Sequence, residues 1–195
     1  MARTRAYAAG AVRAGNCLKG CMLQLQIRTE HEKKIMKANH SKSLEESMVE
    51  LKAIAEDNFI DAFHLKLAPG QENFVSHPIR SLAQAYVYRD QCQPFGIYAE
   101  GKMIGYVMVI YDYDVPEYDI WHMMIDESMQ GRGYGKAALE QVISYIKTKP
   151  FGASNRVALT CNKNNTTARK LYESKGFSAT GIEDEDEIEL VLTIE

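Results

Sequence analysis

The segment QGRGYGK, residues 130–136 of this 195-residue chain, has the residue types of an anion-binding loop. Glycine lacks a Cβ, so Gly131, Gly133 and Gly135 let a ligand approach the backbone amides and permit backbone angles closed to other residues. An apolar periodic stretch typical of a helix follows, and the first amides of a helix have no partner within it. Such amides, at the positive end of the helix dipole, bind phosphate groups.

Two common nucleotide-binding motifs do not fit this glycine loop. A P-loop requires Ser or Thr after its lysine to bind magnesium, but Lys136 is followed by Ala137. A Rossmann fingerprint has the spacing Gly-x-Gly-x-x-Gly early in its domain, whereas this loop has Gly-x-Gly-x-Gly after several elements. The loop therefore favours another phosphate-containing ligand, for which Arg132 and Lys136 would add positive charge.

The loop resembles the Gln/Arg-x-x-Gly-x-Gly/Ala loop with which the GNAT superfamily of N-acetyltransferases binds the pyrophosphate of coenzyme A. A second stretch, residues 162–177, resembles the later Asn-x-x-Ala-x-x-Leu-Tyr-x-x-x-Gly-Phe segment of that family, through Asn165, Ala168, Leu171 and Tyr172. The resemblance as a whole covers roughly residues 48–195 and none of the residues before them. They imply an α/β GNAT (acyl-CoA N-acyltransferase) fold, with a mixed, mostly antiparallel sheet of six to seven strands flanked by about four helices.

The resemblance implies acetyl-CoA as co-substrate and no metal. In the family, backbone groups on the strand before the loop pair with the pantetheine arm, and Met123 and Ile125 match those positions. The residues predicted to bind the cofactor are Met123, Ile125, Gln130, Gly131, Arg132, Gly133, Tyr134, Gly135, Lys136 and Asn165.

The implied reaction needs an acid and a base. An alkyl ammonium has a pKa of about 10.4, so at neutral pH it must lose a proton to attack, and the coenzyme A thiolate must gain one. The resemblance assigns the acid to Tyr172, which could instead only pack between helix and sheet. For the base we consider Asp119 or a water relay, since some family members carry a carboxylate on this strand. Strand alternation puts Asp119 and Trp121 on one face and His122 on the other, as a buried, hydrogen-bonded histidine.

Residues 111–119 contain four carboxylates and three tyrosines, groups that attract ammonium ions by charge and by cation–π contact. We predict Asp112, Asp114, Glu117 and Trp121 as substrate-binding residues; the alternative is a solvated loop. The domain also resembles bacterial diamine and spermidine/spermine acetyltransferases, in Tyr118-x-Ile120-Trp121, Met124-Ile125-Asp126 and Glu187-Ile188. A polyamine is therefore the expected substrate. An aminoglycoside, an amino acid or a protein amine remain alternative substrates, and a non-catalytic acetyl-CoA sensor remains an alternative function.

Hydrophobic periodicity places these residues on alternating strands and helices. The run at residues 120–125 is almost wholly apolar, which is typical of a strand in the middle of a sheet. A hairpin is expected at residues 100–102, between the strands 95–99 and 103–111, and an acidic link at 112–119. The remaining strands are predicted at residues 49–54, 156–161 and 187–194, and the helices at 57–67, 79–89, 135–147 and 166–174 with Asn165 as N-cap.

The composition, 46% hydrophobic and 25% charged, is that of a soluble globular protein, with no apolar stretch long enough to span a membrane. Residues 1–47 carry nine Lys/Arg against four Asp/Glu, whereas residues 48–195 carry fourteen against twenty-two. We expect a basic, disordered extension before one acetyltransferase domain, residues 48–195. The acidic domain disfavours nucleic acid as a partner and suits a cationic small-molecule amine.

The four cysteines are scattered and form no disulfide framework, which predicts a reducing, cytoplasmic location. Cys17, Cys21, His31 and His40 match no common zinc module, so no metal is expected. The sequence does not decide the oligomeric state, and since GNAT proteins are often dimers, the resemblance leaves a homodimer open.

Overall fold

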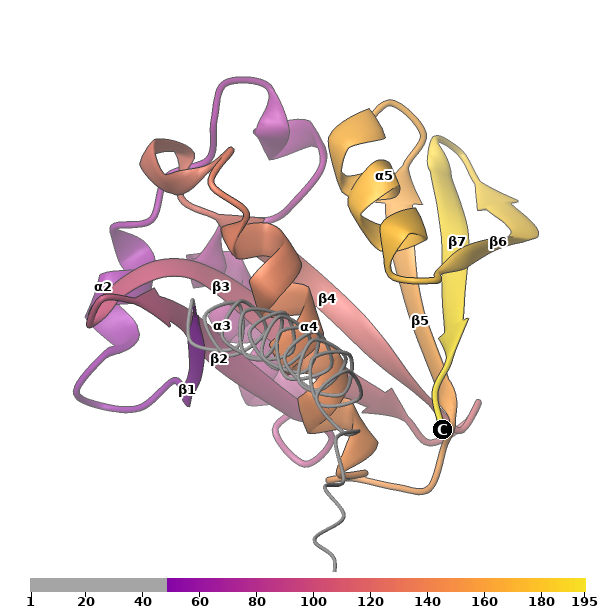
Figure 1. Cartoon of the computed structure of the whole chain (residues 1–195). Coiled ribbons are helices and arrows are strands. Elements are labelled where there is room, and N and C mark those ends of the chain that lie inside the picture. The colour runs from indigo at the N-terminus through magenta and orange to yellow at the C-terminus, as the bar shows by residue number, and fades with distance from the viewer. Residues whose placement is uncertain (1–48) are drawn as a thin grey trace, which may run out of the picture. The chain divides into compact units, whose positions relative to one another are not determined.

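The computed structural model describes residues 49–195, so the predicted extension, residues 1–47, lies outside the described part. The described residues form a seven-stranded sheet in the order β1-β2-β3-β4-β5-β7-β6 (Figure 1). All neighbouring strands are antiparallel except β4 and β5, which are parallel. This arrangement confirms the predicted mixed, mostly antiparallel sheet, with β4 at its centre.

The strands are β1 (Glu50–Ala53), β2 (Cys92–Ala99), β3 (Lys102–Asp112), β4 (Glu117–Ile125), β5 (Arg156–Asn162), β6 (Ser178–Asp184) and β7 (Glu187–Thr193). The helices are α2 (Phe59–Phe63), α3 (Pro78–Val87), α4 (Tyr134–Lys147) and α5 (Thr166–Ser174), with 3-10 turns η1 (Gln71–Asn73) and η2 (Glu127–Met129). No helix among residues 49–195 is long and apolar enough to cross a membrane.

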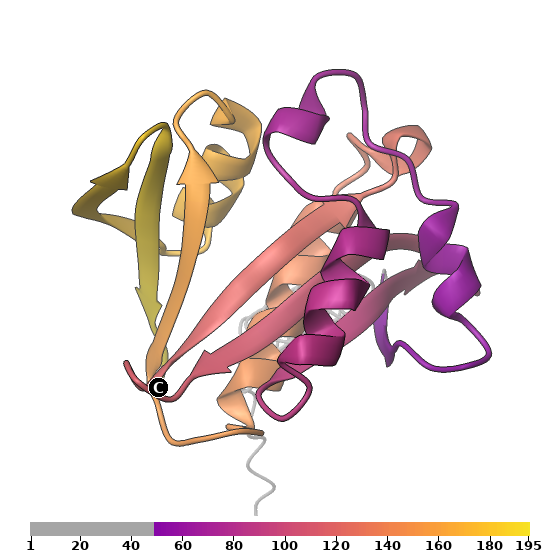
Figure 2. The ribbon, with the colours of Figure 1, turned by 180° about the vertical axis from the view of Figure 1, so that it is seen from behind.

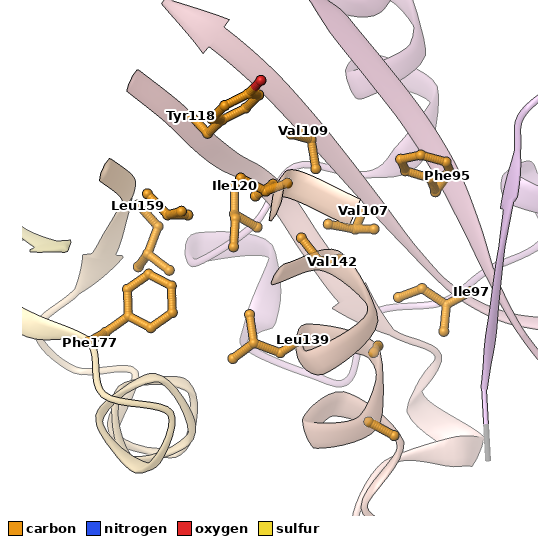
Figure 3. Packing of buried hydrophobic residues seen from close by; sticks show 14 of the residues in the cluster. Phe95, Ile97, Val107, Val109, Tyr118, Ile120, Leu139, Val142, Leu159 and Phe177 are labelled. Carbon is orange, nitrogen blue, oxygen red and sulfur yellow. The ribbon is translucent and has the colours of Figure 1, made fainter. Parts of the chain in front are cut away.

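Helices cover both faces of the sheet. Helix α4 lies on one face (Figure 1), and α3 lies on the opposite face (Figure 2). The apolar side of α4 is buried, and its Leu139 and Val142 point toward Val107 and Ile120 of the sheet (Figure 3). On the α3 face, Met124 and other sheet residues form a second core with α2 and α3. Alternate residues of the central strands are therefore buried on opposite faces, which explains why β3 and β4 read as continuous apolar runs.

The predicted hairpin between β2 and β3 is confirmed. Glu100 has a φ of 51° and Gly101 a φ of 77°, so both central residues adopt the left-handed conformation. Two such residues form the type I′ turn, whose twist matches that of the flanking strands.

Three elements differ from their predictions. The helix expected over residues 57–67 is only α2, because the backbone of Lys66 bonds elsewhere: its N–H donates to the Asp126 carboxylate (2.8 Å) and its carbonyl accepts from Glu127 N–H (2.9 Å). The expected acidic link at 112–119 is a four-residue turn, since Glu117 to Asp119 already belong to β4. Strand β6 was not predicted, because all its residues are exposed and it carries no apolar alternation.

Strands β4 and β5 separate soon after they meet. Their pairing comprises only Tyr118 with Val157 and Asp119 with Ala158, and beyond these residues the strands diverge (Figure 1). Strand β5 continues its antiparallel pairing with β7 along its whole length, so the sheet opens on the β4 side of β5. This opening positions the candidate site.

Strand β4 also contains a bulge. Met108 of β3 pairs with Trp121 and Tyr106 pairs with Met124, so three steps along β4 oppose two steps along β3. His122 lies in this bulge with a φ of 53°, a left-handed conformation rare for a residue other than glycine. The extra residue shifts the alternation of side chains by one position.

Candidate active site

A cavity of about 720 Å³ lies where β4 and β5 separate. Its walls come from β4, the end of β5, the glycine loop, α5, the start of β7 and, on the other side, residues 71–76 with α3. The predicted site residues that line it are Trp121, Met123, Ile125, Gln130, Gly131, Tyr134, Gly135, Asn165 and Tyr172. The fold thus brings the two sequence motifs, which are separated along the chain, to one cavity.

The edge of β4 that faces this cavity has no strand beside it. From Ile120 onward β4 forms no backbone pairs with β5, although it remains paired with β3. An unpaired strand edge can bind an extended ligand through backbone hydrogen bonds. The side chains of Met123 and Ile125 pack against the α4-side core, so their backbone is what they offer to the cavity. Their contact with a pantetheine arm stays a prediction.

The glycine loop offers a set of free amides. Gly131 has a φ of 76° and Gly133, the N-cap of α4, a φ of 85°, so glycine is required at both positions. None of the amides from Gly131 to Gly135 donates a hydrogen bond to another described residue. Nothing lies within 4 Å of the position that a Cβ of Gly131 would take. An anion can therefore approach these amides without meeting side chains.

The charged residues of the loop lie at the surface, and their contact with a phosphate stays a prediction. Arg132 and Lys136 are exposed and lie outside the cavity lining, and the Arg132 guanidinium donates to the carbonyl oxygen of Ser128 (3.0 Å). Gly133 is also outside the lining, although its neighbours in the loop reach the cavity.

The side chain of Gln130 holds the start of the glycine loop in place. Its side-chain amide donates to the carbonyl oxygen of Ile125 (2.9 Å) and to Gln71 Oε1 (2.8 Å). These bonds fasten the start of the loop to the end of β4 and to η1. Its side chain is therefore engaged within the protein.

Helix α5 delivers Tyr172 to the cavity. The Asn165 side chain accepts from the Ala168 amide (3.2 Å), which confirms the predicted N-cap and fixes the start of the helix. Tyr172 is half-buried, and its hydroxyl has no hydrogen-bond partner among residues 49–195. Burial, with a smaller effect of the nearby Cys161, raises the pKa of Tyr172 far above its ordinary value. The phenol is therefore protonated at physiological pH and can donate a proton.

The bulge in β4 corrects the prediction for His122. Strict alternation would put His122 opposite Trp121, but its Nδ1 lies 2.7 Å from the hydroxyl oxygen of Ser81 on α3, the face on which Trp121 also packs. His122 lines the cavity and is only partly buried. Burial, together with the positive charge of Arg80, lowers the pKa of His122, so the ring is neutral at pH 7.

The predicted acidic residues lie at the other end of β4. Asp112, Asp114, Glu117 and Asp119 are not among the residues that line the cavity. The Asp112 carboxylate accepts from the amides of Asp114 (2.7 Å) and Val115 (3.1 Å) and so stabilises the turn. Glu117 is buried and pairs with Arg156. Burial, then the charges of Glu117, Asp112 and Glu189, raise the pKa of Asp119 to about 6.

Several lining residues were missed by the sequence analysis. They come from the segment after η1, from α3 and from the β5–β7 hairpin, and they include Glu72, Phe74, Arg80, Gln84, Thr160 and Glu187. The segment 71–76 has no periodicity that would single it out, and only the fold carries it to the cavity. Glu72 and Glu187 are the carboxylates of the lining, and among residues 49–195 no group of three metal-ligating side chains is present.

This geometry combines free amides for an anion, an unpaired strand edge for an extended chain, and, in the lining of the same cavity, a protonated tyrosine and a neutral histidine. Residues 57–177 match the acetyltransferase (GNAT) family. The chain belongs to the GNAT family of N-acetyltransferases. In this GNAT enzyme the glycine loop lies between strand β4 and helix α4, where the sequence predicted it, and α5 carries the second motif.

Known GNAT proteins resemble the chain over most of their length. The spermine/spermidine N(1)-acetyltransferase of Bacillus subtilis (strain 168) is 27% identical over 142 residues, covering 68% of this chain and 90% of that protein. The Vibrio cholerae spermidine N-acetyltransferase, crystallised with CoA and spermine, superposes with a TM-score of 0.61 at 18% identity, covering 75% and 96% of the two chains. The Escherichia coli ribosomal-protein-S18-alanine N-acetyltransferase gives 0.58 at 22% identity, covering 76% and 95%. At these identities the structural matches establish the GNAT fold.

Proposed function

We propose that this GNAT enzyme transfers the acetyl group of acetyl-CoA to a primary amine of a polyamine, such as spermidine, spermine or a diamine. The amine attacks the thioester directly while both substrates are bound, and Tyr172 acts as the general acid. One observation carries the proposal: the glycine loop, the unpaired edge of β4 and Tyr172 line the same cavity.

The residues present suit a pantetheine nucleotide. The free amides from Gly131 to Gly135 lie at the positive end of α4 and would hold the pyrophosphate. The unpaired edge of β4 would hold the amide groups of the pantetheine arm by backbone hydrogen bonds. The arm would then run along β4 toward its bulge.

Tyr172 supplies the proton that the departing thiolate requires. A free thiol has a pKa of about 8.5, below that of an ordinary phenol, so proton transfer from Tyr172 would be uphill in water. Burial disfavours negative charge on either group, however, and raises both pKa values. The rise in the pKa of the thiol favours its protonation by Tyr172, whereas the rise in the pKa of the phenol opposes it.

The polyamine assignment rests on the named relatives and on the charge of the cavity. The similar B. subtilis protein bears the name spermine/spermidine N(1)-acetyltransferase. Glu72 and Glu187, from opposite walls, would attract the ammonium groups of an extended polycation, and Trp121 offers a ring face. These residues take the place of Asp112, Asp114 and Glu117 as the substrate contacts that the cavity favours.

Release of thiol from acetyl-CoA tests this function. The purified protein would be assayed with spermidine, spermine, a diamine, an aminoglycoside, an amino acid and a lysine peptide. We expect the highest kcat/KM with a polyamine and a loss of at least about tenfold in Glu187→Gln. Preference for another amine would replace the substrate, and binding of acetyl-CoA without transfer to any amine would favour a sensor.

A further inference from the structure

We propose that His122, held by Ser81, is the base that accepts the proton of the attacking amine. The inference rests on the proposed function and names a residue that the motifs do not assign. It follows from the bulge in β4, from the contact between His122 and Ser81 of α3, and from the buried hydroxyl of Tyr106, which has no hydrogen-bond partner among the described residues.

The bulge gives His122 access to the cavity. With a φ of 53° the residue departs from the path of a regular strand and joins the cavity lining. A left-handed conformation is unfavourable at a residue other than glycine and is retained where packing enforces it. Here the contact with Ser81, which is completely buried, fixes the ring.

The free nitrogen of the ring is Nε2. Nδ1 is occupied by Ser81 at 2.7 Å, whereas Nε2 has no hydrogen bond to any described residue. Nε2 is not one of the fully buried polar atoms that lack a hydrogen-bond partner. Because it has no partner, it is accessible to solvent. An accessible ring nitrogen that lines the cavity is placed to receive a proton from a bound amine.

Tyr106 indicates which tautomer this arrangement favours. Its hydroxyl is fully buried and forms no hydrogen bond of acceptable geometry among residues 49–195, yet Ser81 is close to it. Because this oxygen has no partner, it is an acceptor toward which Ser81 can direct its proton. Ser81 then accepts from Nδ1–H of His122. In this tautomer Nε2 carries the lone pair that a base needs.

The surroundings of His122 keep the ring neutral before the reaction. Burial and then the charge of Arg80 lower its pKa, so at pH 7 the ring has the unprotonated form that a base requires. Arg80 from α3 is the charged group that acts on the ring, and the other titratable side chains of the cavity lining are Glu72, Tyr134, Cys161, Tyr172 and Glu187. Asp119, by contrast, is not part of the lining.

The protons balance over the whole reaction. His122 takes one proton from the ammonium, and the neutral nitrogen forms the C–N bond as the C–S bond breaks. Tyr172 gives its proton to the departing thiolate, and the second proton lost by the nitrogen restores the phenol. His122 releases its proton to solvent, so one amide, one thiol and one proton are the products.

The experiment compares three variants with the wild type. His122→Asn suits the left-handed backbone and can still bond Ser81, but it cannot accept a proton near neutral pH. His64→Asn makes the same change at an exposed histidine outside the cavity. Asp119→Asn removes the competing base. The readouts are kcat/KM for spermidine from pH 5 to 10, acetyl-CoA affinity, and the nitrogen NMR shifts of the His122 ring.

We expect His122→Asn to lower kcat/KM about 100-fold at pH 7, with acetyl-CoA affinity changed less than about threefold. Its kcat/KM should then rise with hydroxide up to the pKa of the amine, whereas the wild type reaches a plateau above the pKa of His122. His64→Asn should match the wild type. A wild-type profile in His122→Asn, or loss of the plateau in Asp119→Asn alone, would overturn the proposal.

The NMR shifts test the placement without turnover. In the wild type we expect Nδ1 protonated and Nε2 bare, and in Ser81→Ala a shift of the population toward Nε2–H. A wild-type ring protonated at Nε2 would also overturn the proposal. If the wild type acetylates no amine, the proposed function fails, and the tautomer still decides whether Nε2 is available as a base.

Discussion

The side-chain amides of Gln71 and Gln130 bond each other reciprocally. Gln130 Nε2 donates to Gln71 Oε1 at 2.8 Å, and Gln71 Nε2 donates to Gln130 Oε1 at 3.2 Å. Gln71 Oε1 also accepts from the Ala68 amide (3.1 Å). Two segments far apart in the sequence, η1 and the glycine loop, are joined across the cavity by this pair.

Gln71→Ala removes the pair and leaves polar groups of Gln130 without partners. Because such groups are partly buried, we expect unfolding in urea to show a loss of about 1–2 kcal/mol. The loop amides would also be held less firmly, so calorimetry should show weaker CoA binding by about threefold to tenfold. Gln93→Ala is the control, since that amide bonds the backbone of the adjacent Pro94 away from the cavity. Equal CoA affinity in the two variants would contradict a positioning role for Gln71.

Tyr172→Phe tests the general acid. The variant keeps the ring that packs against Phe177, with centroids 5.8 Å apart, and removes only the hydroxyl. We expect kcat to fall by about 10²- to 10⁴-fold, because the thiolate must then leave without a proton. Acetyl-CoA affinity measured by calorimetry should change little. Unaltered turnover would remove Tyr172 from the mechanism.

Gly131→Ala tests the anion site. Its φ of 76° would strain an alanine by about 1–2 kcal/mol, although the Cβ itself would meet no atom within 4 Å. The new methyl group would stand where a bound pyrophosphate approaches the amides, so we expect CoA affinity to fall about tenfold or more. The matched control is Gly181→Ala, which has a φ of 90°, equally open surroundings and a position on β6. Both variants should lose similar stability, and similar CoA affinities would argue against the loop as the pyrophosphate site.

Asp119→Asn should change stability in a pH-dependent way. The pKa of Asp119 is raised to about 6 in the folded protein, mainly by burial, against about 3.9 in an unfolded chain. The folded state therefore holds this proton more tightly, and the wild type loses stability as pH rises from about 4 through 6. The variant avoids that loss, so urea unfolding should show it more stable by about 2 kcal/mol at pH 8 and nearly equal at pH 4. Asp114→Asn, at an exposed carboxylate, should show no such difference between the two pH values.

Several features of the fold were predictable because their signals are local in the sequence. Gly131 and Gly133 occupy left-handed positions, and Glu100-Gly101 forms a turn that depends on no distant residue. Asn165 caps α5 by accepting from the amide of Ala168, three residues away. The apolar run of β4 correctly indicated a central strand. These features rest on contacts within a few residues, so residue type and spacing suffice to predict them.

The directions of the β4 side chains and the residues that line the cavity follow from the three-dimensional fold and could not be predicted from local patterns. The bulge depends on the register between β3 and β4, and one extra residue moves His122 to the face of Trp121. The early separation of β4 from β5 leaves Asp119 in the paired part of the sheet and Trp121 in the cavity wall. Pairing register and strand divergence are set by contacts between distant segments, so they cannot be predicted from the residue pattern within one strand.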